Sequence, residues 1–208
     1  VEIKEQLFGP DDVETARSRE RLGRVLTSTL AFAEAQQLLE QSLGVLESSL
    51  GGANADVANA LESIGRVFVA QSQFDSARQR FEQALALREK LVGPDDLPVA
   101  NTLRLLGECA SSVNDVPKAT ELLQRSQRIY ERSGQPEHPD LANPLTALGQ
   151  VLRVAGDYNQ ARSHLERAVR IIEASFGPDS PLVAHPLTQL GLVLTDMEEL
   201  TLAARNLE

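Results

Sequence analysis

Three asparagines recur at steps of 42 residues, at Asn59, Asn101 and Asn143, and His185 follows one step later. A side-chain amide both donates and accepts hydrogen bonds. A ladder of such amides could therefore hold the backbone of an extended peptide. The alternative is that these side chains cap or solvate the starts of helices, where asparagine is common.

Arginines in the first half of the chain could recognise carboxylates, because a guanidinium group pairs with a carboxylate through two parallel hydrogen bonds. They are Arg17, Arg21, Arg24, Arg66 and Arg104. Glu20, Glu62 and Glu108 lie among them, so the alternative is a solvated surface of ion pairs. The local excess of positive charge favours an acidic ligand, because salt screens more distant charges beyond about 8 Å.

Residues able to do catalytic or metal chemistry are few and scattered. The spacings of His138, His164 and His185 match no metal motif. His138 with Asp140 fits the start of a helix, and Cys109 fits a small buried side chain. The chain contains neither a P-loop nor a dinucleotide fingerprint. We therefore expect no enzyme activity in this fragment, no cofactor and no metal.

Composition narrows the choice of partners. The 208 residues carry a formal net charge of −10, whereas a nucleic-acid binder needs a basic face. The single cysteine excludes an internal disulfide and fits a reducing, cytoplasmic location. No run of residues approaches the length of a membrane helix, and there is no secretory leader, so we expect no membrane partner. The chain begins with Val1 and is interpreted as a fragment of a longer protein.

The step of 42 residues runs through the whole sequence. Gly93–Gly107 reads GPDDLPVANTLRLLG, and related segments occupy 51–65 and 177–191. Copies at such a period predict a solenoid, here a single array over 1–208. Residues 1–8 would end a preceding helix B, and the repeats would cover 9–50, 51–92, 93–134, 135–176 and a truncated 177–208.

Each period predicts two antiparallel helices, A and B, joined by a short polar turn. Helix A is expected over 12–30, 54–71, 96–113, 138–155 and 180–197. Helix B is expected over 32–50, 74–92, 116–133, 158–175 and from 200 to the end. Apolar residues at spacings of three, four and seven put one stripe on each helix, and neighbouring hairpins must stack to bury it.

One glycine recurs in the middle of every helix A, where it costs about 1 kcal/mol relative to alanine. These are Gly23, Gly65, Gly107, Gly149 and Gly191. We expect the missing side chain to let two helices approach closely. The natural opposing surface is the alanine series of helix B, at Ala35, Ala77, Ala119, Ala161 and Ala203.

The pattern resembles the tetratricopeptide repeat. Helix A carries an apolar residue before glycine and another three residues after it, and helix B carries aromatic–x–x–Ala followed by a large apolar residue. The 42-residue unit, with its GPDxPxVA-like linker and the LREKLVGPDD stretch from Leu87 to Asp96, is similar to repeats of kinesin light chain and nephrocystin-3-like proteins. The resemblance implies an all-α, right-handed superhelix of about five helix-turn-helix repeats.

The resemblance also implies a function, because the A helices of such arrays line a concave groove. The expected function is a protein-interaction scaffold that binds a protein or peptide in that groove, and the arginines favour an acidic one. Alternatives are a structural module that self-associates and a sensor array that regulates a catalytic domain elsewhere; the oligomeric state stays open. The expected groove residues are Arg17, Arg21, Arg24, Asn59, Ser63, Arg66, Asn101, Arg104, Asn143 and Arg153.

Three departures from the family pattern qualify this expectation. Arg19 stands where the later repeats have leucine, so the first repeat either packs differently or is partly exposed. The Leu-Asn-Asn-Leu motif of kinesin light chain repeats is absent, which argues against cargo binding of that type. Pro144 and Pro186 fall in the first turns of helix A, so these helices either start late, with proline in the first position, or kink.

Overall fold

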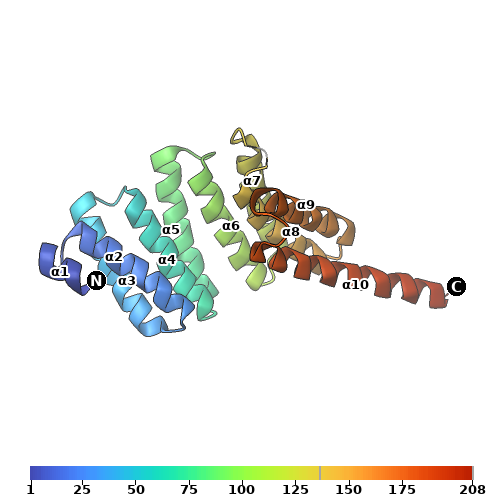
Figure 1. Cartoon of the computed structure of the whole chain (residues 1–208), viewed down its shortest axis with the longest axis horizontal. Coiled ribbons are helices and arrows are strands. Elements are labelled where there is room, and N and C mark those ends of the chain that lie inside the picture. Colours follow the sequence, from blue (N-terminus) through green and yellow to red (C-terminus); the bar gives the residue numbers. More distant parts are fainter. Residues whose placement is uncertain (136, 208) are drawn as a thin grey trace. The chain divides into compact units, whose positions relative to one another are not determined.

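The computed structural model describes residues 1–135 and 137–207, with side chains described up to Glu198. Each regular element in these ranges is helical, so the all-α class is confirmed (Figure 1). The α-helices are α1 (Glu2–Phe8), α2 (Val13–Ser28), α3 (Phe32–Leu50), α4 (Ala55–Ala70), α5 (Phe74–Val92), α6 (Leu97–Ser112), α7 (Val116–Arg132), α8 (Ala142–Val154), α9 (Tyr158–Phe176) and α10 (Ala184–Leu207). Two short 3₁₀ helices, η1 (Pro139–Leu141) and η2 (Pro181–Val183), precede α8 and α10.

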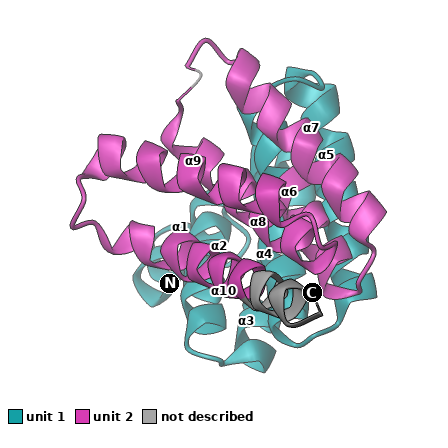
Figure 2. Cartoon of the chain, turned by 90° about the vertical axis from the view of Figure 1, so that its right-hand side faces the viewer, with its two compact units in different colours: residues 1–102 teal, residues 103–208 magenta. Residues whose placement is uncertain are grey.

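The chain forms two compact units, residues 1–102 and 103–208, with the boundary inside α6 (Figure 2). Unit 1 contains the hairpins α2–α3 and α4–α5 and the first part of α6. Unit 2 contains the rest of α6, α7, the hairpin α8–α9 and α10. Within the described parts of both units, no helix is long and apolar enough to cross a membrane.

Short polar side chains start several of the helices. The Oδ1 atom of Asp12 accepts a hydrogen bond from the Glu14 backbone N–H at 2.8 Å, and Asn54 accepts one from Asp56 at the same distance. Each satisfies a backbone donor that has no partner within its own helix. Asp115 and Asp157 cap α7 and α9 in the same way.

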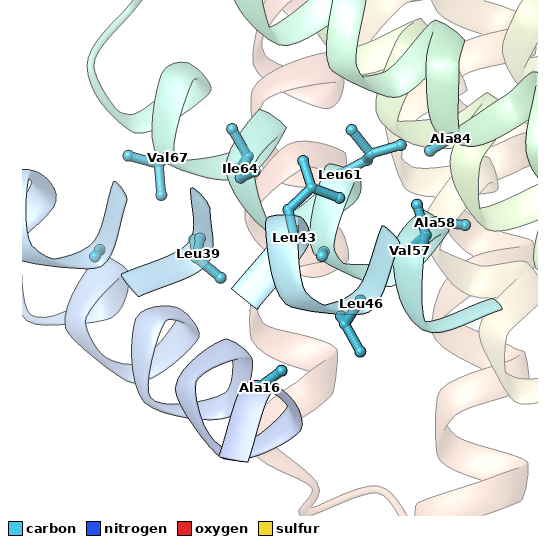
Figure 3. Close-up of a cluster of buried hydrophobic side chains, with 12 residues drawn as sticks. Ala16, Leu39, Leu43, Leu46, Val57, Ala58, Leu61, Ile64, Val67 and Ala84 are labelled. Carbon is cyan, nitrogen blue, oxygen red and sulfur yellow. The ribbon is translucent and has the colours of Figure 1, made fainter. Parts of the chain in front are cut away.

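Four of the five recurrent glycines pack against helix B as expected, whereas a Cβ atom on Gly191 would meet nothing within 4 Å. A Cβ atom on Gly23, Gly107 or Gly149 would lie 2.4–2.6 Å from the Cγ atom of the leucine sixteen residues downstream. The opposing group is thus mainly this large apolar side chain, with the backbone oxygens of Ala35 and Ala119 slightly farther away. The buried side chains of the first two hairpins form one cluster with Leu39, Leu46 and Ile64 inside it (Figure 3).

Arg19 shows how the first repeat departs from the others. Its side chain is buried, so the first repeat packs differently at this position. Its guanidinium group lies 2.7 Å from Glu5 of α1 and donates to the Pro10 carbonyl oxygen at 2.7 Å. Residues 61, 103 and 145, at the same register, are leucines with at most 4% of their surface exposed. An ion pair therefore replaces an apolar contact at this position.

The last repeat departs from the predicted hairpin. We expected a turn near residues 198–199, but α10 continues as one helix to Leu207 (Figure 1). The four earlier turns each hold a residue with positive φ, at Leu30, Ser72, Asn114 and Gly156. The corresponding residue here is Glu198, within Met-Glu-Glu, and these residue types favour helix. The Ala203 packing expected from the repeat lies outside the described side chains.

The prolines of helix A are accommodated by 3₁₀ turns. Pro144 is the third residue of α8, not the first, and η1 leads into the helix. Pro186 likewise is the third residue of α10, after η2. The first four N–H groups of an α-helix have no partner within it, so proline removes no intrahelical bond there.

Candidate functional site

Two adjoining pockets lie on the A-helix side of unit 1. The Asn59 pocket has a volume of about 260 Å³ and is lined by Glu20, Arg24, Asn59, Glu62, Ser63, Arg66, Arg88 and Asn101. The Ser28 pocket, of about 350 Å³, is lined by Arg24, Thr27, Ser28, Ser63 and Arg66. The two share Arg24, Ser63 and Arg66, so together they form one continuous polar surface over α2 and α4.

Glu62 is the centre of a hydrogen-bond network beneath the Asn59 pocket. The Glu62 side chain is 9% exposed, and its Oε2 atom lies 2.9 Å from Nη2 of Arg88. Oε2 also accepts from Nδ2 of Asn101 at 3.5 Å, while Oε1 accepts from the Thr102 hydroxyl. A buried carboxylate is stable only when paired and hydrogen-bonded, and this network supplies both conditions.

The two asparagines of the ladder in unit 1 are both joined to this network. Oδ1 of Asn59 accepts from Nη2 of Arg88 at 2.9 Å, and Asn101 donates to Glu62. Neither caps a helix, because Asn54 caps α4 and Asn101 lies in the second turn of α6. The capping interpretation is therefore wrong for Asn59 and Asn101.

Arg24 and Ser63 are connected through Glu20. The Ser63 hydroxyl donates to Oε1 of Glu20 at 2.6 Å, and Nε of Arg24 lies 3.9 Å from the same oxygen. The Arg24 side chain is 64% exposed, and Arg66 and Arg21 are also exposed. Arg24 and Arg66 thus lie at the entrance of the pockets, where a ligand can reach their guanidinium groups.

Arg17 does not line either pocket. Its guanidinium group contacts Asp56 at 2.7 Å and Glu14 at 2.6 Å. The hydrogen bonds to Asp56 and Glu14 raise the pKa of Arg17, and those from Arg17 and Lys4 lower the pKa of Glu14. Arg17 therefore links α2 to the start of α4.

The remaining predicted groove residues lie in unit 2. Arg104 is paired with Glu108 on the same helix, and Nη1 of Arg153 on α8 lies 2.8 Å from Asp196 on α10. Asn143 is exposed at the second position of α8. This placement agrees with the alternative that the asparagine is a solvated residue at the start of a helix. Within unit 1, the pockets bring together five of the predicted residues, namely Arg24, Asn59, Ser63, Arg66 and Asn101.

Sequence reasoning missed Arg88 because it lies on a B helix. The signal was present in the repeat register, where the other B helices place Leu46, Tyr130 and Ile172. Those three side chains are buried, so a charged residue at this register must find a partner inside the protein. Glu62 on the neighbouring helix is that partner.

His138 and Cys109 occupy the structural positions expected from the sequence. Nδ1 of His138 accepts from the Asp140 backbone N–H at 3.1 Å, and its ring lies 5.3 Å from that of Tyr130, which confirms the expected role at a helix start. Cys109 is buried, again as expected. Among the described residues, no group of three or more histidine, cysteine or acidic side chains could hold a metal ion.

A family profile of the tetratricopeptide repeat matches four overlapping segments, residues 31–90, 56–132, 98–173 and 140–208. Comparison with curated proteins gives no significant sequence match.

Solved structures share the fold at low sequence identity. BtubC (BKLC) from P. vanneervenii is 24% identical, with a TM-score of 0.70 over 80% of this chain and 66% of its own, so this chain spans slightly less than two thirds of that protein. The putative kinesin light chain TPR-like repeats of Podosopora anserina are 20% identical with a TM-score of 0.73 over 94% of this chain and 93% of their own. Aspartyl phosphate phosphatase F from Bacillus subtilis is 14% identical with a TM-score of 0.76 over 92% of this chain and 48% of its own.

Proposed function

Because the chain belongs to the tetratricopeptide repeat family, whose repeats mediate protein–protein interaction, we propose that unit 1 binds an extended acidic peptide across the Asn59 and Ser28 pockets. The observation that carries the proposal is the placement of Arg24 and Arg66 at the entrance shared by both pockets. They come from equivalent positions of two successive A helices. A carboxylate between them meets two guanidinium groups.

Polar groups beside the arginines suit a peptide backbone. Asn59 has its carbonyl oxygen bonded to Arg88, so its NH₂ group is the donor available to a ligand carbonyl. The Ser63 hydroxyl lies between the pockets. In this arrangement Arg24 and Arg66 bind an acidic side chain of the peptide, and Asn59 donates to the adjacent peptide carbonyl oxygen.

Local charge supports an acidic ligand although the whole molecule is acidic. The Asn59 pocket is lined by three arginines and two glutamates. At physiological salt, charges farther than about 8 Å away are strongly screened. The charges at the pocket therefore outweigh the net charge of −10 for a ligand seated there.

The test uses a fluorescein-labelled deca-glutamate peptide, which stays extended because its charges repel one another. Fluorescence anisotropy would measure its Kd with the wild type and with R24E/R66E. Loss of two charge-assisted contacts predicts a decrease in affinity of more than tenfold and a weaker salt dependence. The matched control is R78E/R80E on α5, which makes the same change in net charge outside both pockets.

Circular dichroism would first establish that both variants keep their helical content. Equal affinity of the wild type and R24E/R66E for deca-glutamate would contradict the proposal. So would an equal loss of affinity in R78E/R80E, because that result would assign the effect to net charge. Tighter binding of a deca-lysine peptide than of deca-glutamate would show that the site prefers a positively charged ligand and would contradict the proposal.

A further inference from the structure

A departure from the repeat pattern meets a polar position of that pattern under the Asn59 pocket. Arg88 occupies a register that holds the buried, uncharged residues Leu46, Tyr130 and Ile172 in the other complete B helices. The register of Glu62 holds Glu20 in the first repeat, Arg104 in the third and Thr146 in the fourth. The side chains of Arg88 and Glu62 are 13% and 9% exposed and form an ion pair at 2.9 Å.

This ion pair is not needed to pack a hairpin of this kind. The fourth repeat fills the same two positions with Thr146 and Ile172, and both are buried. Taking two charges out of water is costly, and apolar replacements of a buried pair are often equally stable or more stable. Besides linking α4 to α6 through Asn101 and Thr102, the pair is therefore free to serve recognition.

The geometry of the pair fixes the side chain of Asn59. Nη2 of Arg88 donates both to Oε2 of Glu62 and to Oδ1 of Asn59, each at 2.9 Å. The amide oxygen of Asn59 is thereby held toward Arg88. An asparagine amide can adopt two orientations, in which the oxygen and the NH₂ group exchange places. The bond to Arg88 selects the orientation in which the NH₂ group is the donor available to a ligand.

We infer that Glu62 and Arg88 are positioning residues for peptide recognition, which hold Asn59 with its amide donor toward the carbonyl oxygen of a bound peptide. This inference rests on the proposed function of the Asn59 pocket. Glu62 orients Arg88, and Arg88 orients Asn59; neither needs to touch the peptide. The pair contributes no net charge, so its effect on binding is separable from attraction by Arg24 and Arg66.

The decisive variant is E62T/R88I, which copies the fourth repeat and leaves the net charge unchanged. We expect the same helical content and an unfolding midpoint equal to or above that of the wild type. Its affinity for deca-glutamate should fall about three- to tenfold, the effect of losing one neutral hydrogen bond. The salt dependence of binding should stay unchanged.

A double-mutant cycle with Asn59→Ala shows whether the effect passes through Asn59. Introduced into the wild type, N59A should weaken binding as much as E62T/R88I does, by about three- to tenfold. Introduced into E62T/R88I, it should have almost no further effect. Full affinity of E62T/R88I, or an undiminished effect of N59A in that background, would overturn the inference. If E62T/R88I does not fold, E62Q/R88M takes its place, because it also leaves the net charge unchanged and methionine fills the space of the arginine stem but has no donor for Oδ1 of Asn59.

A measurement without ligand separates this inference from the proposed function. In the wild type the side-chain amide of Asn59 should show a high NMR order parameter, and in the variant a clearly lower one. A wild type that does not bind deca-glutamate would contradict the proposed function, while the order parameter would still decide the positioning role. Equal order parameters in both proteins would overturn that role even if the peptide binds.

Discussion

A Cβ atom built on Gly65 would lie 2.4 Å from Cε1 of Phe81, whose side chain is completely buried. Interiors are packed too closely for the ring to move aside without cost. We therefore expect Gly65→Ala to lower the free energy of unfolding of unit 1 by about 1–3 kcal/mol, although alanine has the higher helix propensity. Urea denaturation followed by circular dichroism would measure this difference.

Gly191 provides the matched control for that substitution. It occupies the same register, but a Cβ atom there would meet nothing within 4 Å. Gly191→Ala should stabilise α10 by about 1 kcal/mol, because only the backbone propensity changes. A stabilising Gly65→Ala would show that the close approach to Phe81 does not require glycine.

The ion pair between the buried Arg19 and the partly exposed Glu5 predicts that its two residues respond differently to substitution. Glu5→Ala leaves the Arg19 guanidinium group with the Pro10 carbonyl oxygen but without its carboxylate, so unit 1 should lose about 1–3 kcal/mol. Arg19→Leu introduces the residue that the next three repeats use, and it should be neutral or stabilising. Urea denaturation would measure the free energy of unfolding of both variants. A larger decrease in Arg19→Leu than in Glu5→Ala would contradict this prediction.

His164 predicts a pH dependence in unit 2. Burial, with the nearby Arg167, lowers the pKa of His164 below its ordinary 6.5. Its stabilising contribution is therefore complete above about pH 6.5 and is lost as the pH falls through that value toward the folded-state pKa. His164→Leu introduces the residue that occupies this register at Leu38 and Leu122. It should reduce the change of the thermal unfolding midpoint between pH 7.5 and pH 5.5.

Glu131 acts in a separate, lower window. Burial raises its pKa, but hydrogen bonds from Gln127 and Arg167 outweigh burial and lower it below 4.5. Stability from this carboxylate is therefore lost only as the pH falls below about 4.5. A slope that persists in His164→Leu would contradict the role of His164.

The all-α class, the repeat and most helix limits could be predicted from the residues alone. Glycine, aspartate and asparagine at recurrent positions act within a few residues, so their effects can be recognised without knowing the fold. The recurrent glycines also identified the close approach of helix A to helix B, because a residue that costs helix stability five times in register needs a packing reason. The candidate pocket residues Arg24, Asn59, Ser63 and Arg66 followed from the same register.

The pairing of the charged residues, in contrast, became visible only in the folded chain. Arg17, Arg104 and Arg153 were predicted on the same groove face as Arg24 and Arg66, and the folded chain pairs them with Asp56, Glu108 and Asp196. Arg88 joined the site from another helix. Ion pairing depends on distances of a few ångströms between residues far apart in the chain, and a periodic sequence specifies the face of a helix but not those distances. The continuation of α10 also appeared only in the structure, although its cause is local, because the residues around Glu198 favour helix where the earlier repeats turn.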